Sequence, residues 1–319
     1  MPTYSLVIPV FNEEETLPEL ARRLSELMER LDGDCEVILV DDGSRDRSFD
    51  IMTDIHSSDE RFKLIRFSRN FGHQVAISAG MDFASGQAII IMDADLQDPP
   101  EVVLEMTRHW RAGSDVVYGV RKERLGETWF KKTTAAMFYR LLRKFTGMDI
   151  PVDTGDFRLV DRKALDAFKS LREHNRYVRG MFTWVGFKQT GVKYLRSERF
   201  AGSTKYPLSK MLKLALDGIL SFSFAPLRFI LTGGIFITLA SIVVGLCAIV
   251  TALFRHPILP SLGIMTVILA FFTGIQLIVV GILGEYIGRI YEDVRNRPLY
   301  IVHDTVGLKD ESKVHIPKN

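Results

Sequence analysis

Cysteine is scarce in this chain of 319 residues, and its two copies are not expected to pair. Cys35 lies in a globular part of the sequence, whereas Cys247 lies in the middle of a long apolar run. No H-E-x-x-H motif is present, and the seven histidines show no metal-binding spacing with cysteine. The opening residues MPTYSLVIPV lack the charged start and the small-residue cleavage site of a signal peptide. These absences argue against a disulfide framework and against a zinc enzyme.

Two glycine-rich motifs that hold nucleotides are missing as well. The first predicted strand is followed by PVFNEEE, which has no glycine where the dinucleotide fingerprint would have to begin. No G-x-x-x-x-G-K-[ST] loop occurs anywhere, so the usual phosphate cradle is absent. A phosphate group bound by this chain must therefore be held in another way.

Charged residues are missing from two long stretches. Phe229–Phe254, with 26 residues, and Pro257–Gly284, with 28 residues, contain no Asp, Glu, Lys or Arg. Each exceeds the roughly 20 residues that cross the hydrocarbon core of a bilayer, so both are predicted membrane spans that tilt. A long buried helix of a soluble protein is the alternative. Elsewhere the composition is globular, since 47% of all residues are apolar, 25% are charged and the net charge is only +2.

The link between the two predicted spans is too short to hold a domain, so the spans are expected to form a hairpin. Within the turn, Arg255 is the sole Lys or Arg. Basic residues are more frequent outside the hairpin: Lys205, Lys210, Lys213 and Arg228 precede it, and Arg289, Arg295 and Arg297 follow it. By the positive-inside rule, we expect a multi-pass protein of the cell (inner) membrane with both termini in the cytoplasm.

The first 200 residues alternate between strand and helix patterns. The predicted strands are YSLVIPV, CEVILV, FKLIRF, QAIIIMD and DVVYGV, with helical patterns between them. The first helix is expected to open at Asn12, with Glu15 three positions later as in a capping box. Strands separated by helices of about 10 to 15 residues form crossover connections. The sequence therefore predicts an α/β fold, with a mostly parallel sheet and helices on both faces.

Acidic side chains follow these strands, at the edge where parallel sheets bind ligands. Glu13–Glu15 follow the first strand, Asp41 and Asp42 follow the second, and Asp93 and Asp95 follow IIIM. Because side chains alternate along an extended chain, Asp93 and Asp95 are expected on the same side. Helix caps and turns are the alternative explanation for any single acidic pair. Two pairs on neighbouring strands favour an oxygen-rich site for a hard cation, Mg²⁺ or Mn²⁺, that lets a diphosphate approach.

Four segments, in this order and spacing, carry a resemblance to a known family: LVIPVFNEEETL, VILVDDGSRDRS, RNFGHQVAISAGMDFASG and IIIMDADLQDPP. They look like the catalytic domain of family 2 glycosyltransferases, which has the GT-A nucleotide-diphospho-sugar transferase fold. The later segments DTGDFRLVDR and RFAGSTKYPLSKMLKLALDGI, with two spans after them, resemble polyisoprenyl-phosphate hexosyltransferases. These include bactoprenol glucosyltransferases and dolichol-phosphate mannose synthases. The resemblance covers residues 3 to about 300.

The resemblance implies a nucleotide-sugar site at the sheet edge. Pro9, Glu13 and Asp41 would lie in the nucleoside pocket. Asp93 would lie near the ribose and the sugar phosphate, and Asp95 would be the metal ligand. These positions agree with the physical expectation that carboxylates accept hydrogen bonds from a base or ribose and bind a hard cation.

Three further residues belong to the same predicted site. Gln97 would support the metal or the diphosphate, by the resemblance. Arg121 ends the strand YGVR at the rim, where it could pair with a phosphate; a surface arginine near Glu123 is the alternative. Asp156, in GDFRLV, sits where related enzymes with alcohol acceptors keep a general base. Asp93, Asp95 and Asp156 are thus the predicted catalytic residues.

A polyprenyl phosphate acceptor needs positive charges that let two anionic substrates approach each other more than it needs a base. Its second pKa of about 6 makes it largely a dianion at pH 7, so it is already nucleophilic. Asp156 is therefore expected to orient the sugar or an arginine, and only secondarily to act as a base. Arg199, Ser203 and Lys205, in RFAGSTKY, are the predicted ligands of the acceptor phosphate.

The segment KYPLSKMLKLALDGILSFSF has a basic stripe opposite an apolar face, which predicts a helix lying in the membrane interface. A core helix of the globular part is the alternative. The predicted organisation is a cytoplasmic GT-A catalytic domain over residues 1–200 and an interfacial segment over 201–226. Two membrane helices over 227–290 and a cytoplasmic tail over 291–319 complete it.

The predicted activity is the inverting, metal-dependent transfer of a hexose to a polyisoprenyl phosphate, with UDP-glucose as the preferred donor. The alternatives are a mannose synthase that uses GDP-mannose and a non-catalytic, membrane-anchored sensor of nucleotide sugars. A processive polysaccharide synthase is disfavoured, because a Q-x-x-R-W motif and additional spans are missing. The expected partners are a nucleotide sugar, a polyprenyl phosphate lipid, the membrane and further copies in a homo-oligomer, with no nucleic acid.

Overall fold

The computed structural model describes residues 2–122, 154–171, 173–174, 176–197, 227, 230–237, 239, 243 and 262–308. The chain divides into two compact units. Unit 1 comprises Met1–Ala215 and Arg297–Asn319, and unit 2 comprises Leu216–Asn296. Unit 1 therefore contains sequence from both sides of the two uncharged stretches.

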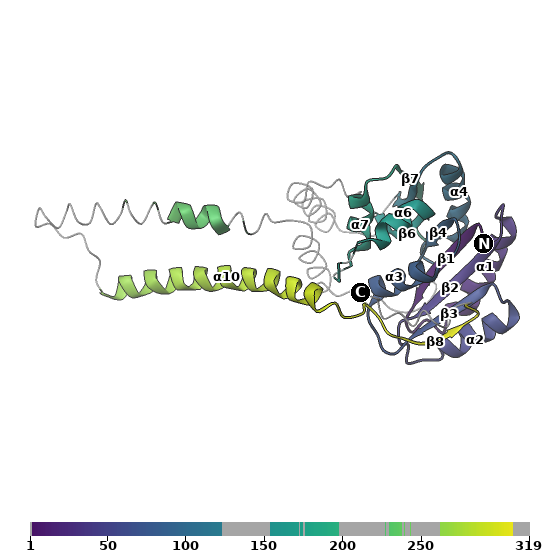
Figure 1. The fold of residues 1–319 in the computed structure, drawn as a ribbon, viewed down its shortest axis with the longest axis horizontal. Coiled ribbons are helices and arrows are strands. Elements are labelled where there is room, and N and C mark those ends of the chain that lie inside the picture. Colours follow the sequence, from purple (N-terminus) through teal and green to yellow (C-terminus); the bar gives the residue numbers. More distant parts are fainter. Residues whose placement is uncertain are drawn as a thin grey trace, which may run out of the picture. The chain divides into compact units, whose positions relative to one another are not determined.

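Unit 1 is built on an eight-stranded mixed sheet (Figure 1). Its strands are β1 (Tyr4–Val10), β2 (Cys35–Asp41), β3 (Phe62–Phe67), β4 (Ala88–Ile91), β5 (Val116–Arg121), β6 (Thr154–Asp161), β7 (Gln189–Tyr194) and β8 (Val302–Val306). They lie in the order β7-β5-β6-β4-β1-β2-β3-β8. Neighbours pair in parallel except that β6 is antiparallel to β4 and β5, and β8 is antiparallel to β3. The predicted α/β fold with a mostly parallel sheet is confirmed.

Helices cover both faces of this sheet (Figure 1). The helices are α1 (Leu17–Arg30), α2 (Ser48–Ser58), α3 (His73–Phe83), α4 (Val103–Arg111), α6 (Arg162–Lys169) and α7 (Val178–Val185), with a short 3-10 turn η1 (Pro100–Val102) before α4. Apolar residues of α1, α2 and α4 share one core with alternate residues of the strands. On the opposite face α3 approaches β1 so closely that a Cβ on Gly80 would lie 2.3 Å from Val7 Cγ1. Only glycine permits this approach.

Helix α1 begins later than the capping-box pattern predicts. Its N-cap is Thr16, and Pro18 occupies the first turn, where a missing N–H leaves no hydrogen bond unmade. Asn12 has φ 55°, in the left-handed region that asparagine tolerates, and its Oδ1 accepts a hydrogen bond from Arg45 N at 2.9 Å. The capping box at Asn12 and Glu15 is therefore wrong, because Asn12 holds the loop after β2 instead.

The chain that follows unit 2 returns to the sheet. Within the predicted tail, residues 291–319, the segment Val302–Val306 is the edge strand β8. Just before it, Tyr300 donates a hydrogen bond to Asp82 Oδ2 at 3.0 Å and stacks on Phe67, with ring centroids 5.2 Å apart. The sequence predicts a tail in this region and no strand, so β8 is an addition to that prediction. A five-residue strand with a single buried residue carries too few apolar positions to be recognised from sequence.

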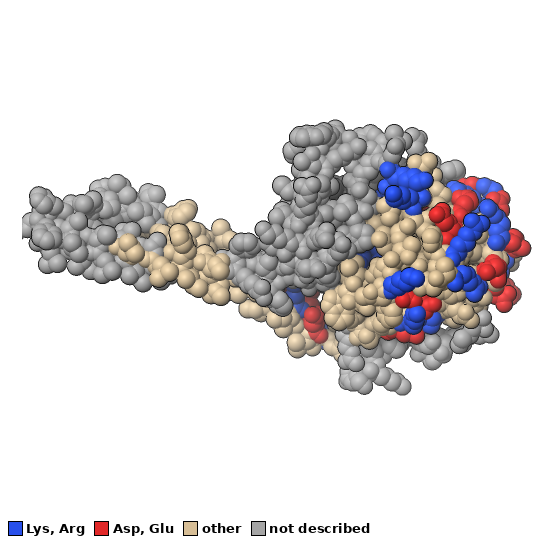
Figure 2. Space-filling model, turned by 90° about the horizontal axis from the view of Figure 1, so that it is seen from above, with Lys and Arg blue, Asp and Glu red and all other residues tan. Residues whose placement is uncertain are grey.

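Unit 2 contains the long helix α10 (Leu262–Arg295). Its part Phe271–Arg295 is long and apolar enough to cross a membrane, by length and composition. Large apolar side chains, among them Leu277, Val280 and Ile287, are exposed on α10. In Figure 2 the part of this unit that is described is tan over most of its length, with charged side chains toward one end.

The first uncharged stretch is described only in part. Residues 230–237, 239 and 243 belong to it, and all of them are helical. The hairpin of two membrane helices stays a prediction. The predicted interfacial segment, residues 201–226, lies outside the described residues.

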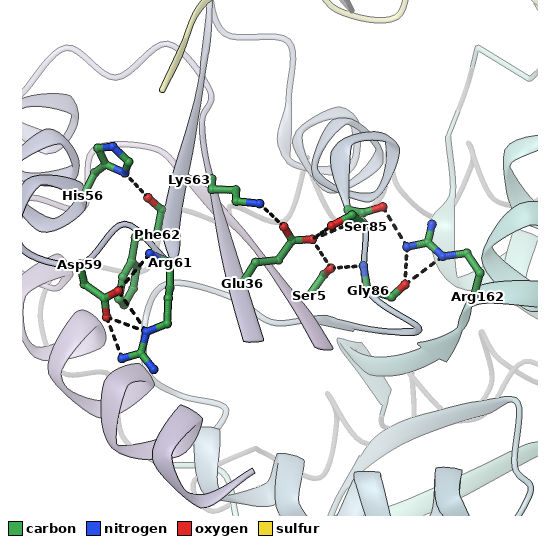
Figure 3. A network of polar contacts seen from close by, with 11 residues as sticks. Ser5, Glu36, His56, Asp59, Arg61, Phe62, Lys63, Ser85, Gly86 and Arg162 are labelled. Carbon is green, nitrogen blue, oxygen red and sulfur yellow. Dashed lines mark hydrogen bonds and ion pairs between the residues drawn. The ribbon is translucent and has the colours of Figure 1, made fainter. Parts of the chain in front are cut away.

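A polar network joins the amino ends of β1, β2 and β3 to the turn before β4 (Figure 3). At its centre Glu36, 3% exposed, accepts hydrogen bonds from Ser5 Oγ at 2.5 Å, Ser85 N at 2.7 Å and Ser85 Oγ at 2.8 Å. Lys63 is its ion-pair partner. Burial raises the pKa of Glu36, but these donors outweigh burial and hold the pKa below its ordinary value. The network fixes the strands at the edge opposite to the acidic residues.

Replacing Glu36 with glutamine is expected to lower the free energy of unfolding by about 2–4 kcal/mol, because Lys63 loses its counter-charge at a buried site. The folded-state pKa of Glu36 lies below the 4.5 of a free glutamate. The contribution of the ionised group is therefore complete above pH 4.5 and is lost as the pH falls through the folded value. Denaturant unfolding at several pH values measures the difference in the free energy of unfolding between the natural protein and Glu36→Gln. The exposed Glu60→Gln is the control, and an equal loss in both variants would contradict the assignment.

Candidate active site

Strand β6 brings Asp156 to the rim where the parallel strands end, because β6 runs in the opposite direction and begins there. Ile91 of β4 lies opposite Arg158 of β6. Continued by two residues, this register sets Asp93 opposite Asp156. Asp156 is only 3% exposed. The antiparallel strand thus joins two predicted catalytic residues that are far apart in the sequence.

His73, the first residue of α3, lies between these two carboxylates. Its Nε2 is 3.3 Å from Asp93 Oδ1 and 3.5 Å from Asp156 Oδ2. Burial lowers the pKa of His73, but the charge of Asp93 and hydrogen bonding to both carboxylates outweigh burial and raise the pKa well above 6.5. Two carboxylates this close repel each other unless a positive charge separates them. The imidazolium of His73 supplies that charge.

Asp156 is hydrogen-bonded at both carboxylate oxygens. Arg179 donates to Oδ1 from Nε at 2.9 Å and to Oδ2 from Nη2 at 3.1 Å, and Gln74 Nε2 donates to Oδ2 at 3.0 Å. Burial raises the pKa of Asp156, yet the charges of Arg179 and His73 hold it well below its ordinary value. A carboxylate in this state is a weak proton acceptor and a rigid hydrogen-bonding group.

Asp42, the residue directly after β2, holds the loop that leads to His73. Its Oδ1 accepts a hydrogen bond from Phe71 N at 2.7 Å, and its Oδ2 accepts one from Gly72 N at 3.0 Å. Burial raises the pKa of this carboxyl above its ordinary value. Gly43 leaves room for the same loop, since it has φ +69° and a Cβ there would lie 2.6 Å from loop backbone atoms. Asp42 therefore positions the active-site histidine through the backbone.

The residues predicted for the nucleoside pocket lie at the ends of two adjacent parallel strands. Pro9 is within β1, Glu13 is in the loop after it, and Asp41 ends β2. Asp41 is fully buried: its Oδ1 accepts a hydrogen bond from Ser44 N at 2.9 Å, and its Oδ2 lies 3.6 Å from Arg66 Nε. The fold therefore brings these three predicted residues to one edge, beside Asp93.

Asp95 and Gln97 lie in the loop between β4 and η1. Gln97 N donates a hydrogen bond to Asp95 Oδ1 at 3.1 Å. Leu96 between them has φ 57° and is buried. A leucine in this left-handed region costs roughly 1–2 kcal/mol, and such strain gathers at functional sites. The loop is thus held in a conformation that local preference alone would not choose.

The side chains of this loop fit a divalent cation that substrate phosphates help to bind. Among the described residues, no group of three His, Cys, Asp or Glu side chains could hold a metal ion unaided. Mg²⁺ commonly uses one or two carboxylates and completes its shell with water and substrate phosphates. Asp95 suits this role as a hard oxygen ligand. Asp93 Oδ1, which is buried and lies 3.3 Å from His73 Nε2, adds negative charge beside it.

Arg121, the last residue of β5, extends over the start of β6. A Cβ on Gly155 would lie 2.8 Å from Arg121 Nη2, so the missing side chain of Gly155 makes room for the guanidinium. The Nε of Arg121 is buried. Arg121 as a whole is half-buried, and its positive charge stands next to Asp156.

The structure also contains site residues that the sequence did not single out: His73, Gln74 and Arg179. His73 and Gln74 stand in RNFGHQ, where the available signal was a histidine at the start of a helix beside an acidic site. Arg179 gave no signal, because only folding brings α7 to β6. The predicted acceptor ligands Arg199, Ser203 and Lys205 lie outside the part of the chain that the structure describes.

The comparison with known families decides the class of this site. The family described as "Glycosyl transferase family 2" matches residues 5–168. The chain is a family 2 glycosyltransferase. The Bacillus subtilis (strain 168) protein called "Uncharacterized glycosyltransferase YkcC" is 51% identical over 308 residues, 97% of this chain and 95% of its own length. The "Bactoprenol glucosyl transferase" of Shigella phage SfII is 41% identical over 299 residues, covering 93% and 96%.

A solved structure supports the fold of this glycosyltransferase. Glucosyl-3-phosphoglycerate synthase from Mycobacterium tuberculosis, crystallised with Mn²⁺, UDP and glucosyl-3-phosphoglycerate, superposes with a TM-score of 0.50 and 19% identity. The match covers 68% of this chain and 77% of that one. The resemblance to family 2 glycosyltransferases and the GT-A-like fold are thereby confirmed.

Replacing His73 with glutamine is expected to lower sugar transfer about 10- to 100-fold, because Asp93 and Asp156 then repel without a cation between them. Stability should fall by about 1–2 kcal/mol, an amount reduced by the partial exposure of the imidazole. Because folding raises the pKa of His73, its contribution is complete below pH 6.5 and is lost as the pH rises through the folded value.

Thermal melting at increasing pH checks the sign of this dependence. The gap in melting temperature between the natural protein and His73→Gln should be widest near pH 6 and should narrow in alkaline buffer. His109→Gln, in α4, serves as the matched control. A gap that widens with rising pH would show that His73 is neutral in the folded protein.

Proposed function

We propose that this glycosyltransferase transfers a hexose, glucose from UDP-glucose, to a polyisoprenyl phosphate such as bactoprenol phosphate at the cytoplasmic face of the membrane. The observation that carries the proposal is the similarity to bactoprenol glucosyl transferases over nearly the whole chain, the long helix α10 included. The product would be a lipid-linked sugar, with the anomeric configuration inverted.

The donor site is supported by the acids at the ends of β1, β2 and β4. In the proposal, Pro9, Glu13 and Asp41 contact the nucleoside, and Asp93 lies beside the ribose and the sugar phosphate. The solved relative with Mn²⁺ and UDP supports a divalent cation and a uridine donor for this chain. Mg²⁺ or Mn²⁺, when bound, would neutralise the departing diphosphate.

Asp95 would hold this cation, and Gln97, whose N–H bonds to Asp95, would keep the carboxylate turned toward it. Arg121 adds a fixed positive charge at the same rim. Charges that are in place before the reaction need no rearrangement as negative charge develops on the leaving diphosphate. The role of these groups is therefore electrostatic.

Asp156 acts in this proposal as an orienting group for the sugar. Arg179 and Gln74 fix its position, and Oδ1, with one donor in the described structure, retains room to accept a hydrogen bond from a sugar hydroxyl. The acceptor phosphate is already a dianion, so its oxygen attacks the anomeric carbon without transferring a proton. The bond from that carbon to the diphosphate breaks, and the nucleoside diphosphate leaves.

The acceptor side and the membrane arrangement complete the proposal. Arg199, Ser203 and Lys205 would bind the lipid phosphate, and the basic segment 201–226 would lie in the interface. Helix α10 supports a membrane anchor. The sequence is the basis for proposing two spans over 227–290, cytoplasmic termini and assembly into a homo-oligomer.

The experiment is an assay of sugar transfer from radiolabelled nucleotide sugars to polyprenyl phosphate in detergent, with the full chain. Transfer from UDP-glucose above that from other UDP-hexoses and GDP-mannose is expected. Transfer from GDP-mannose alone would show that the donor is GDP-mannose and not UDP-glucose. An absence of transfer from every donor, with nucleotide binding retained, would instead favour the membrane-anchored sensor.

A further inference from the structure

Asp98, the last acid of DADLQDPP, is fully buried and has no part in the proposed mechanism. Its Oδ1 accepts a hydrogen bond from the hydroxyl of Tyr194, and Arg196 Nε lies 3.7 Å from the same oxygen. Burial and the nearby charge of Asp93 raise the pKa of Asp98 above its ordinary value, although Arg121 and Arg196 counter them. A carboxyl group is costly in such a place unless hydrogen bonds and opposite charges offset its loss of hydration.

The contacts of Asp98 join two segments that are distant in sequence. Tyr194 is the last residue of β7, and Asp98 belongs to the loop that carries Asp95. The ring of Tyr194 packs edge-on against Phe157, with centroids 5.7 Å apart, so its hydroxyl is aimed by a buried aromatic pair.

A second contact fastens the same two segments. The backbone N–H of Ser197 donates a hydrogen bond to the carbonyl of Gln97 at 2.9 Å. The residues that follow β7 are therefore attached to the loop that carries Asp95, by a side-chain contact at Asp98 and by a backbone hydrogen bond at Gln97. The sequence reaches Arg199, the first predicted acceptor ligand, two residues after Ser197.

We propose that Asp98, Tyr194 and Ser197 form a clasp, which holds the residues that follow β7 against the loop that carries Asp95. The clasp thereby sets how well the enzyme uses its lipid acceptor. The inference rests on the proposed function, because it takes the acceptor to be a polyprenyl phosphate. Asp98 and Tyr194 are positioning residues, which touch neither substrate.

The physical basis of the clasp is preorganisation. A chain segment that must present cations to an incoming phosphate loses affinity if it is ordered only on binding. Fastening the end of β7 to the loop that carries Asp95 fixes the point from which the chain continues toward Arg199, and bimolecular transfer depends on the relative placement of its reacting groups. Tyr194 also contacts Arg121 on the donor side, so loss of the clasp should weaken acceptor binding far more than donor binding.

The test compares Tyr194→Phe with Tyr118→Phe in the full chain. Tyr194→Phe removes only the hydroxyl and keeps the ring that packs on Phe157. Tyr118 lies on the neighbouring strand β5, and its hydroxyl has no hydrogen bond among the described residues. The measurements are KM for polyprenyl phosphate, Kd for UDP with Mn²⁺, and amide exchange of the peptide containing Ser197.

Tyr194→Phe is expected to raise the acceptor KM about tenfold, leave the Kd for UDP within about twofold, and speed exchange at Ser197. Tyr118→Phe should change none of these. An unchanged acceptor KM, an equal loss of UDP binding, or unchanged exchange at Ser197 would overturn the clasp.

The failure of the clasp and the failure of the proposed function give different results. If the natural protein transfers no sugar to polyprenyl phosphate, the proposed function fails, and the role of the clasp in acceptor use fails with it. Amide exchange at Ser197 needs no substrate, so it still decides whether Tyr194 fastens the two segments.

Discussion

Asp95→Asn is expected to lower sugar transfer by at least about 100-fold, because the side chain that would hold the divalent cation loses its charge. The change is nearly isosteric, and the amide can still accept the hydrogen bond from Gln97 N, so the loop should keep its shape. Transfer from UDP-glucose measured over a range of Mn²⁺ concentrations checks this. The concentration of Mn²⁺ that gives half-maximal activity should rise as well.

Glu60→Gln removes one exposed carboxylate far from the site in sequence and is the matched control for net charge. It should leave both activity and the response to Mn²⁺ unchanged. Full activity of Asp95→Asn, or full activity of the natural protein in excess chelator, would rule out the metal role of Asp95.

Asp156→Asn should reduce kcat about 100-fold or more and should also destabilise the protein by about 3 kcal/mol. The carboxylate is the counter-charge of Arg179 and His73, so its loss leaves two cations close together at a buried site. Steady-state kinetics and denaturant unfolding measure the two effects separately. Because the pKa of Asp156 is lowered, its stabilising contribution is complete at neutral pH and is lost only in strong acid.

The pH profile of this variant distinguishes an orienting group from a base. If Asp156 orients the sugar, the fall in kcat/KM on the acidic side follows protonation of the acceptor phosphate near pH ~6. Asp156→Asn should then retain the same acidic limb at a lower level. Disappearance of that limb in the variant would mean that Asp156 accepts a proton in the reaction. Asp166→Asn, on α6, is the control.

Parts of the fold were predictable wherever short-range pattern determines structure. The largely apolar runs YSLVIPV and FKLIRF coincide with β1 and β3, because strands covered on both faces bury most of their side chains. Strands β6, β7 and β8 were not predicted. Their direction and partners depend on pairing with distant segments, and local sequence does not specify this.

Like the fold, the candidate site was predictable from the sequence only in part. The position of Asp93 and Asp95 at the rim was predictable, because an acidic cluster directly after a buried strand lies at the edge where the parallel strands end. The different tasks of Asp41 and Asp42 were not. They are adjacent in sequence, yet Asp42 binds the loop before α3 and Asp41 lies beside Arg66. Which of two neighbouring acids faces a loop depends on backbone geometry beyond the strand.

The edge strand β8 also bears on the order of biosynthesis. A ribosome translates Val302–Val306 only after both uncharged stretches, so the sheet is still missing one edge while those stretches leave the exit tunnel. Until then the side of β3 that pairs with β8 is an open template for other strands. In the proposed membrane arrangement, insertion into the bilayer would therefore precede completion of the catalytic unit.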